Sequence, residues 1–250
     1  MFVAATSRCY SDLPLDAALR RLVDLEYTNV ELMLHESGGH LKPSYVLANL
    51  DEAVLTCRRT HRLTVCALSV DIETPDEKEY YAQFAACCRL AKAMKVATLT
   101  VRSAELGTPF NAEVERLRDL SAIASNESAR VGLLTEVGRM SQDPDTAVVL
   151  CNSVEGLGIT LDPSHYICGP HAGGPFEQVM KYVYHIRLRD TSKEQMQVRV
   201  GQGEVEYGRL VNQLNKVHYD RALTVDILDI PDVDQMAEMR KMRLLLESLL

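Results

Sequence analysis

The sequence predicts an α/β fold, namely a single (β/α)8 TIM barrel domain that occupies residues 1–250. The chain has 250 residues, close to the length of about 250 that is typical of one such barrel. Short β-branched segments alternate with longer segments of helical periodicity along the whole chain. No linker or composition shift divides the sequence, so one closed barrel is favoured over two domains or an open sheet.

Eight segments have the short, apolar and β-branched character of buried strands. The first is followed by a Leu13-Pro14 break and then by an amphipathic segment. The predicted strands are residues 2–6, 29–33, 63–70, 96–102, 131–137, 158–162, 183–189 and 222–228. Because a helical segment separates each strand from the next, the strands are expected to be parallel and covered by helices.

A segment with helical periodicity follows every predicted strand. These predicted helices are residues 15–25, 45–61, 77–94, 112–125, 144–152, 176–181, 205–217 and 233–249. Proline and short polar side chains that suit a first helical turn occur at Thr74-Pro75-Asp76, Asp143-Pro144 and Pro231-Asp232. An open dinucleotide-binding sheet is the weaker alternative, because no glycine lies in Thr6–Tyr10 after the first strand.

Charge and cysteine content restrict the environment and the partners. The net charge is −8, from 27 basic and 35 acidic side chains, which argues against binding a nucleic-acid backbone. Seven cysteines without a Cys-x-x-Cys pair fit neither a disulfide framework nor a zinc ribbon. The apolar start is too short for a signal peptide, and no apolar run approaches the roughly 18 residues of a membrane span. We expect a soluble cytoplasmic protein.

The polar residues that end the strands are the candidate site residues, because barrel enzymes carry their chemistry at the carboxyl ends of the strands. Carboxylate, imidazole and guanidinium groups dominate there. They are Glu31, His35, Arg102, Glu136, Asp162, His165, His185, Arg187, Arg189, Asp190 and Asp226.

Strand alternation places His185, Arg187 and Arg189 on one face of the seventh strand, which must look into the barrel. Three carboxylates from strands five, six and eight would converge with that face. Since unpaired carboxylates repel one another, a divalent cation or an arginine is expected to neutralise them.

Five motifs together resemble the xylose isomerase-like TIM barrel family of sugar phosphate isomerases and epimerases, which belongs to the AP endonuclease family 2 superfamily. That family includes ketose 3-epimerases, hydroxypyruvate isomerase, inosose dehydratase and endonuclease IV. The resemblance spans the chain in element order, but its distinctive motifs all lie after residue 130. They are Leu134-Thr-Glu136, Ile159-Thr-Leu-Asp162-Pro-Ser-His165, His185-Ile-Arg-Leu-Arg-Asp190, Gly201-Gln-Gly203-Glu-Val-Glu-Tyr207 and Leu223-Thr-Val-Asp226.

The resemblance implies a divalent-metal site (Mn, Mg, Co or Zn) with Glu, Asp, His and Glu ligands from strands five to eight. Glu136 and Asp162 match that pattern, and His165 matches a further family histidine. Arg187 stands where the family has its ligand histidine, and Asp226 replaces the final glutamate. Arginine offers no lone pair to a metal. Either His185 completes the metal shell with the three carboxylates, or Arg187 replaces the cation and bridges them.

The resemblance also implies a sugar, sugar-phosphate or polyol isomerase or epimerase that works through an enediolate. Glu136 and Asp226 would exchange the proton next to a carbonyl, and the metal or Arg187 would hold the enediolate. His165 would orient a substrate hydroxyl, while Arg102 or Arg189 would hold an acidic or phosphorylated group. His35 is a further substrate-binding candidate.

Other interpretations of the same residues predict a barrel without catalytic activity. Glu136 can form an ion pair with a neighbouring arginine, and Asp162-Pro-Ser-His165 can be a solvated turn. Arg187 can form a structural salt bridge to Asp162 or Asp226. The chain would then be a catalytically silent barrel that binds a sugar-like ligand or a partner.

Two further expectations concern a rival activity and self-association. An abasic-site endonuclease is disfavoured, because residues 194–198 lack the Asp-x-His of its metal cluster. The closing stretch, residues 236–250, has methionine and leucine at helical spacing. It is expected to pack on the barrel, and it could also bury a homodimer contact.

Overall fold

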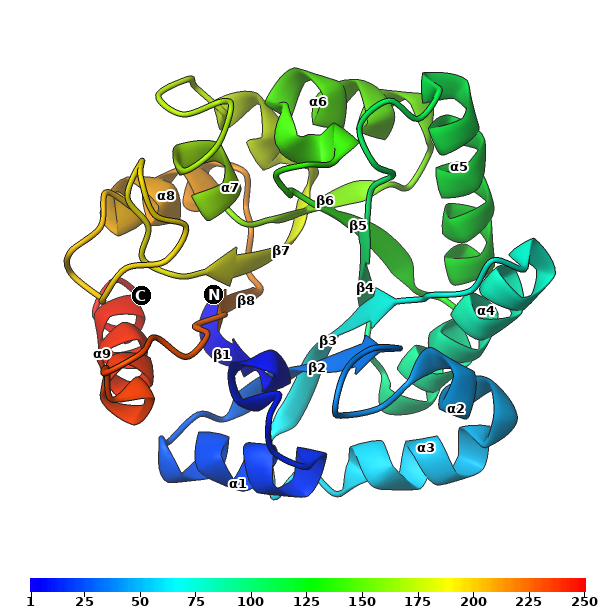
Figure 1. The fold of residues 1–250 in the computed structure, drawn as a ribbon, viewed down its shortest axis with the longest axis horizontal. Coiled ribbons are helices and arrows are strands. Elements are labelled where there is room, and N and C mark those ends of the chain that lie inside the picture. Colours follow the sequence, from blue (N-terminus) through cyan, green and yellow to red (C-terminus); the bar gives the residue numbers. More distant parts are fainter.

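A computed structural model describes all residues, 1–250, and it contains one closed barrel of eight parallel strands in the order β1 to β8. Figure 1 looks along the barrel and shows the strands inside a ring of helices. The strands are β1 Phe2–Thr6, β2 Asn29–His35, β3 Thr64–Asp71, β4 Thr98–Arg102, β5 Arg130–Leu134, β6 Gly158–Leu161, β7 Val183–Leu188 and β8 Ala222–Val225. The predicted fold class and all eight strands are confirmed.

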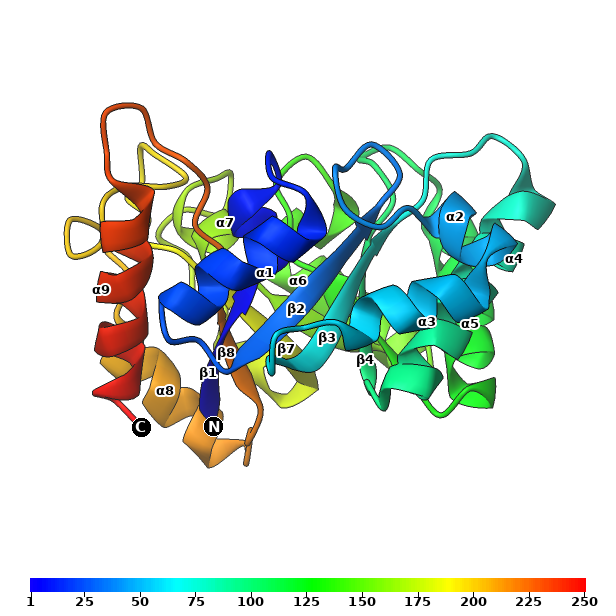
Figure 2. The same cartoon turned by 90° about the horizontal axis from the view of Figure 1, so that it is seen from below.

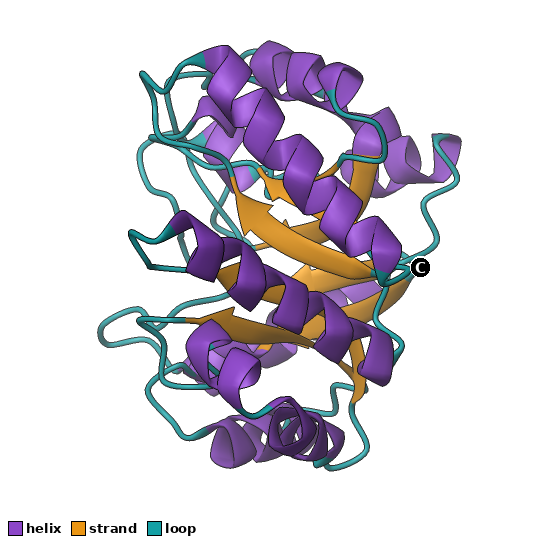
Figure 3. Ribbon diagram, turned by 90° about the vertical axis from the view of Figure 1, so that its right-hand side faces the viewer, coloured by secondary structure: helices purple, strands orange, loops and turns teal.

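Helices lie outside the strands on the side of the barrel that faces the viewer in Figure 3, and Figure 1 shows them around the barrel. The α-helices are α1 Leu15–Asp24, α2 Pro43–Ala48, α3 Leu50–Arg58, α4 Glu77–Met94, α5 Phe110–Asn126, α6 Pro144–Ser153, α7 Ser164–Ile167, α8 Tyr207–Lys216 and α9 Gln235–Glu247. Three short 3-10 helices are η1 Ser7–Tyr10, η2 Met140–Gln142 and η3 Glu177–Tyr182.

Two of the predicted helices differ from the observed ones. The segment 45–61 is not one helix, because Asn49 leaves the helical region (φ −140°, ψ 54°) between α2 and α3. Asparagine favours such breaks because its side chain competes for backbone hydrogen bonds. The segment 176–181 is the 3-10 helix η3, which leads directly into β7 at Val183, so the chain has no room for a longer helix.

Aspartate caps begin three of the helices, and two of the caps lie where the sequence suggested. Asp76 accepts a hydrogen bond from the N–H of Glu79, and Asp143 accepts one from Thr146. The last helix begins two residues later than predicted, because Asp234 rather than Asp232 caps it. Each cap satisfies an N–H group that the first helical turn leaves unpaired.

Two irregularities in strand register lie at strands that carry site residues. The β2–β3 pairing shifts between Val30 and Glu31, and the β6–β7 pairing shifts between Ile159 and Thr160. Such shifts re-aim side chains next to them and are common beside active sites. Glu31 comes directly after the first shift, and His185 pairs with Thr160, which comes directly after the second. Both side chains are buried inside the barrel.

Apolar packing between strands and helices forms one core, which contains Leu32, Phe84, Leu117, Ile186 and Leu214 among its fully buried members. In the side view of Figure 2, β1 rises from the N-terminus and the loops that follow the strands gather along the upper edge. None of the helices combines the length and the apolar character that crossing a membrane requires. All seven cysteines are free.

Candidate active site

A cavity of about 280 Å³ opens at the carboxyl end of the barrel. Four predicted site residues line it, namely His35, Arg102, Glu136 and Arg187. Three residues that the prediction did not include, Arg8, Ser69 and Asp71, line the same cavity. Side chains at or near the carboxyl ends of β1 to β5 and of β7 therefore meet at this cavity, which we call the mouth cavity.

Arg102 holds two carboxylates on the wall of the mouth cavity. Its Nε and Nη2 atoms lie 2.8 Å and 2.6 Å from the two carboxylate oxygens of Glu136. Its Nη1 atom lies 3.2 Å from Oδ2 of Asp71. A guanidinium carries five N–H donors, so Arg102 keeps two that these bonds do not use. The predicted alternative of an ion pair between Glu136 and an arginine is thus present in the structure.

The surroundings shift the pKa values of the two carboxylates on Arg102 in opposite directions. Burial raises the pKa of Asp71, and the single bond from Arg102 does not reverse that rise. Burial would also raise the pKa of Glu136, but the hydrogen bonds from Arg102 outweigh it and lower the pKa. The site thus favours the ionised form of Glu136 and disfavours that of Asp71.

Helix α5 fixes the backbone that carries Arg102. Arg116 donates from Nη2 to the carbonyl oxygen of Arg102 at 3.0 Å, and it forms a two-point ion pair with the buried Glu113. Glu113 also accepts a hydrogen bond from the N–H of Ala104. These contacts connect the β4 end to the helix behind it and hold Arg102 at the mouth.

Arg189 bridges two buried carboxylates at the ends of β6 and β8. Its Nη2 atom lies 2.6 Å from Asp162 and 2.9 Å from Asp226. Burial alone would raise the pKa of Asp162, but the charge of Arg189 outweighs it and lowers the pKa. One oxygen of Asp226 and Nε of Arg189 are buried without a partner. Neither carboxylate lines the mouth cavity.

Arg187 does not bridge Asp162 and Asp226, so that expectation is wrong. It forms a two-point pair with the fully buried Glu31, at 3.0 Å and 2.7 Å. Glu31 ends no strand but sits early in β2, deep enough for Arg187 to reach across the barrel. Burial opposes the ionisation of Glu31, but the charge of Arg187 holds its pKa well below the usual range.

His185 lies in the same interior layer as Glu31. Its Nε2 atom is 3.2 Å from Glu31 and 3.2 Å from the hydroxyl of Thr224. The prediction that His185, Arg187 and Arg189 share the inward face of β7 agrees with these contacts. Glu136, Asp162 and Asp226 make their ion pairs elsewhere, so His185 does not join them in one group.

The two remaining predicted histidines have separate surroundings. His165 accepts a hydrogen bond from the N–H of Val137 at Nδ1, and its Nε2 atom lies 3.7 Å from Asp162. Burial lowers the pKa of His165. His35 lies 2.8 Å from the hydroxyl of Ser69, and burial together with Arg187 and Arg8 lowers its pKa to about 3. Both rings are neutral at pH 7.

The donor set at the mouth does not fit a divalent metal. No three His, Cys, Asp or Glu side chains are grouped to hold one. The carboxylates that were predicted as metal ligands form ion pairs with arginines. Arg102 pairs with Glu136, and Arg189 pairs with Asp162 and Asp226. A guanidinium donates hydrogen bonds and offers no lone pair, so these residues form ion pairs rather than a coordination shell.

The three lining residues that the prediction did not include are Asp71, Arg8 and Ser69, and the first two left a signal in the sequence. Asp71 ends β3, but the predicted strand stopped at Val70, one residue short. Arg8 lies two residues after the end of β1, in the polar segment that follows the predicted strand. Glu31 was already a candidate, but strand periodicity alone does not indicate that it pairs with Arg187.

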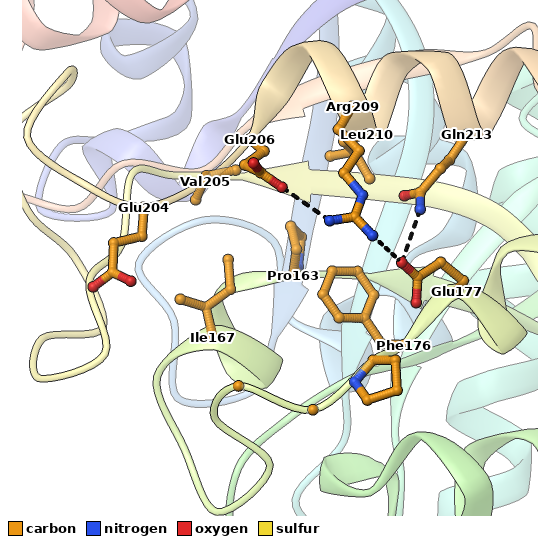
Figure 4. Close-up of a pocket in the computed structure, with 13 residues that line it drawn as sticks. Pro163, Ile167, Phe176, Glu177, Glu204, Val205, Glu206, Arg209, Leu210 and Gln213 are labelled. Carbon is orange, nitrogen blue, oxygen red and sulfur yellow. Dashed lines mark hydrogen bonds and ion pairs between the residues drawn. The ribbon is translucent and has the colours of Figure 1, made fainter.

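A second cavity, of about 330 Å³, lies between helix α8 and the segment after β6. Figure 4 shows Arg209 pairing there with Glu206 and Glu177, beside the ring of Phe176. Arg209 and Glu177 are both well exposed. None of the predicted site residues lines this cavity, so the mouth of the barrel remains the candidate active site.

Comparisons with known proteins agree with this architecture. The family model for a xylose isomerase-like TIM barrel matches residues 19–247. No curated protein matches the chain.

Solved structures with the same fold are distant in sequence. A xylose isomerase domain protein from Alicyclobacillus acidocaldarius is 14% identical with a TM-score of 0.77, over 100% of this chain and 98% of that one. The 3-keto-D-glucoside 4-epimerase YcjR from E. coli is 12% identical with a TM-score of 0.75, over 99% of both chains. The IolI protein, solved with a zinc atom, is 17% identical with a TM-score of 0.73, over 100% and 98%.

Proposed function

The chain belongs to the xylose isomerase-like TIM barrel family, and from that premise we propose that it is a carbohydrate isomerase or epimerase. The reaction moves a proton from a carbon next to a carbonyl group. The observation that carries the proposal is the pair Glu136 and Asp71, which flank Arg102 on the wall of the mouth cavity. Two neighbouring titratable groups whose surroundings shift their pKa values in opposite directions are typical of an acid and a base that act together.

In the proposed step, the Glu136 carboxylate takes the proton from the substrate carbon. The electron pair of that C–H bond moves toward the carbonyl, whose oxygen becomes an enediolate oxygen. The two free N–H donors of Arg102 stabilise this negative charge, as preorganised donors do in other enolising sites. No electrons leave the substrate, so the step needs no oxidant or reductant.

The proton then returns to carbon by one of two routes. If Glu136 gives it to the neighbouring carbon while the hydroxyl proton on the other oxygen passes to the enediolate oxygen, the product is the isomer with the carbonyl moved by one position. If Asp71 delivers a proton from the other side, the product is the epimer. Asp71 thus takes the second carboxylate role that the sequence had suggested for Asp226, because Asp226 is fully buried and held by Arg189.

This mechanism passes no step through a metal, because arginines occupy the carboxylates that would have to bind one. A fixed guanidinium can supply the electrostatic stabilisation that a divalent ion supplies in other enzymes. His165 and His35 are neutral hydrogen-bonding groups near the mouth, and we assign them to orienting substrate hydroxyls.

Deuterium incorporation tests the proposed function directly. The protein is incubated in D2O with a panel of aldoses, ketoses and their acids, and mass spectrometry measures exchange at the carbon next to the carbonyl. We expect exchange into at least one compound, and a loss of roughly 100-fold or more for Glu136→Gln, which keeps the shape but removes the base. Glu105→Gln is the matched control, because Glu105 is 80% exposed.

The second candidate function is a silent barrel that binds a sugar-like ligand, and the Arg189 bridge is the observation that favours it. A cation locked between two buried carboxylates is typical of a structural ion pair. Binding of a panel compound without deuterium exchange, in wild type and Glu136→Gln alike, would overturn the isomerase proposal and support this alternative.

A further inference from the structure

The mouth cavity is rich in arginine, although the chain carries a net charge of −8. Its lining contains three arginines (Arg8, Arg102 and Arg187) and two carboxylates (Asp71 and Glu136). Two carboxylates outside the lining also reach these arginines, since Glu31 pairs with Arg187 and Asp226 lies 3.5 Å from Arg8. The three arginines therefore differ in how many of their donors are already bound.

Arg8 is the arginine whose donors are least engaged. Arg102 and Arg187 each form a two-point pair with a carboxylate. The Arg8 side chain forms no hydrogen bond, and its one ion pair is a 3.5 Å approach of Nη1 to Asp226. Its side chain is 27% exposed, so most of its five donors remain free for a ligand.

The backbone around Arg8 is held in place before any ligand arrives. Thr6 caps the 3-10 turn by accepting a hydrogen bond from the N–H of Arg8 at 3.2 Å. The hydroxyl of Ser7 accepts the N–H of Met33 on β2 at 3.0 Å and contacts His40 at 3.1 Å. These bonds fix the turn to the neighbouring strand, so a ligand need order only the Arg8 side chain.

We propose that Arg8 binds the carboxylate of the substrate, and that the substrate class is therefore the sugar acids. A planar guanidinium matches a carboxylate with two parallel hydrogen bonds, and Arg8 has the free donors to form both. Strands β1 and β5 lie on opposite sides of the barrel (Figure 1). A sugar acid anchored at Arg8 extends across the mouth toward Glu136.

This inference rests on the proposed function in one respect, that the mouth cavity is the substrate site. It differs from the expectation from the sequence, which assigned an acidic substrate group to Arg102 or Arg189. Those two arginines already pair with carboxylates, Arg102 with Glu136 and Asp71 and Arg189 with Asp162 and Asp226.

Calorimetric titration of matched pairs tests the proposal. D-gluconate and D-sorbitol differ in a terminal carboxylate, as do D-glucuronate and D-glucose, and D-glucose 6-phosphate is the phosphate probe. We expect each acid to bind at least roughly tenfold more tightly than its neutral partner. Arg8→Gln should abolish that preference, Arg8→Lys should retain part of it, and Arg20→Gln should leave it unchanged, since Arg20 pairs with Asp16 on the surface.

Equal affinity for acids and neutral sugars, an Arg8→Gln variant that keeps the preference, or no measurable binding of either acid would overturn the proposal. Tighter binding of glucose 6-phosphate that depends on Arg8 would overturn the assignment of a carboxylate, because Arg8 would then bind a phosphate group. The two proposals fail separately. Acid binding through Arg8 without deuterium exchange contradicts the isomerase, whereas exchange into neutral sugars that ignores Arg8→Gln contradicts the sugar-acid inference.

Discussion

Atom Nη2 of Arg189 lies 2.6 Å from Oδ2 of Asp162. The same nitrogen also lies 2.9 Å from Oδ2 of Asp226, and none of the three side chains is more than 5% exposed. Water screens such a buried group poorly, so the charges interact strongly and depend on one another. One guanidinium thus replaces the cation that family resemblance leads one to expect between these strand ends.

Removal of that guanidinium should destabilise the barrel. Arg189→Met leaves two buried carboxylates facing each other, and we expect a loss of about 3–5 kcal/mol in the free energy of unfolding. Urea denaturation followed by circular dichroism measures it. Arg20→Met, in an exposed pair with Asp16, should cost less than about 1 kcal/mol. The triple variant Arg189→Met, Asp162→Asn, Asp226→Asn should recover much of the loss, and a single variant as stable as wild type would show that the bridge contributes little.

Metal affinity should depend on the same arginine. We expect weak binding of Mn2+ by the unmodified protein, and at least roughly tenfold tighter binding by Arg189→Ala, because the carboxylates of Asp162 and Asp226 then offer free lone pairs. Titration calorimetry and the metal-dependent rise in melting temperature measure this. Arg187→His restores the family residue but leaves both carboxylates on Arg189, so it should change affinity little. Tight stoichiometric binding by the unmodified protein would contradict this account.

The free energy of unfolding at acid pH should depend on His35, whose pKa in the folded protein is about 3, below its ordinary value of 6.5. Burial, Arg187 and Arg8 disfavour its protonation, while Glu31 and Asp226 only partly offset them. Between pH 6.5 and about 3 the unfolded chain binds a proton that the folded chain does not. Stability therefore falls as the pH falls through this window, by at most about 1.4 kcal/mol per pH unit from this group.

The variant His35→Gln keeps a donor near the position of Nε2, within reach of Ser69, but does not titrate. We expect it to flatten the slope of unfolding free energy against pH between 6.5 and 3, as measured by urea denaturation at several pH values. His171→Gln is the control, because His171 lies in an exposed loop contact with Pro175. Equal slopes for His35→Gln and wild type would refute the assignment.

The sequence predicted the barrel well because strand and helix periodicities depend on local pattern. Helix α4 matches its predicted bounds, 77–94, and β1 matches 2–6. Family motifs also located the strand ends that carry Glu136 and Asp162. These features depend on neighbours in the chain, so one sequence contains the information.

The pairing of charges could not be predicted in the same way. Arg187 and Arg189 are two residues apart on one face of β7, yet one pairs with Glu31 and the other with Asp162 and Asp226. The choice depends on depth in the barrel and on the register shift between β6 and β7, which periodicity does not reveal. Long flexible side chains then select partners in three dimensions.

The last prediction concerns two glycines near the start of helix α8, where the same change to alanine should have opposite effects on the free energy of unfolding. Asp190 is buried and accepts hydrogen bonds from the N–H groups of Thr191, Gly201 and Gly203. A Cβ at Gly203 would lie 2.0 Å from Oδ1 of Asp190 and 2.6 Å from the backbone nitrogen of Thr191. Gly203→Ala must therefore disrupt this loop, and since hydrogen bonds to a charged group contribute about 1.5–3 kcal/mol each, we expect a loss of that order.

Gly208, the second residue of α8, has an ordinary backbone conformation, and a methyl group added there would have no atom within 4 Å beyond its chain neighbours and the backbone of its own helix. Gly208→Ala should stabilise the protein by about 0.4–1 kcal/mol, because alanine restricts the unfolded chain and suits a helix. Urea denaturation of both variants measures the change in the free energy of unfolding, which we expect to be a loss for Gly203→Ala and a gain for Gly208→Ala. A neutral Gly203→Ala would mean that the loop rearranges at no cost, and Asp190 would then not be what holds the β7–α8 connection over the mouth of the barrel.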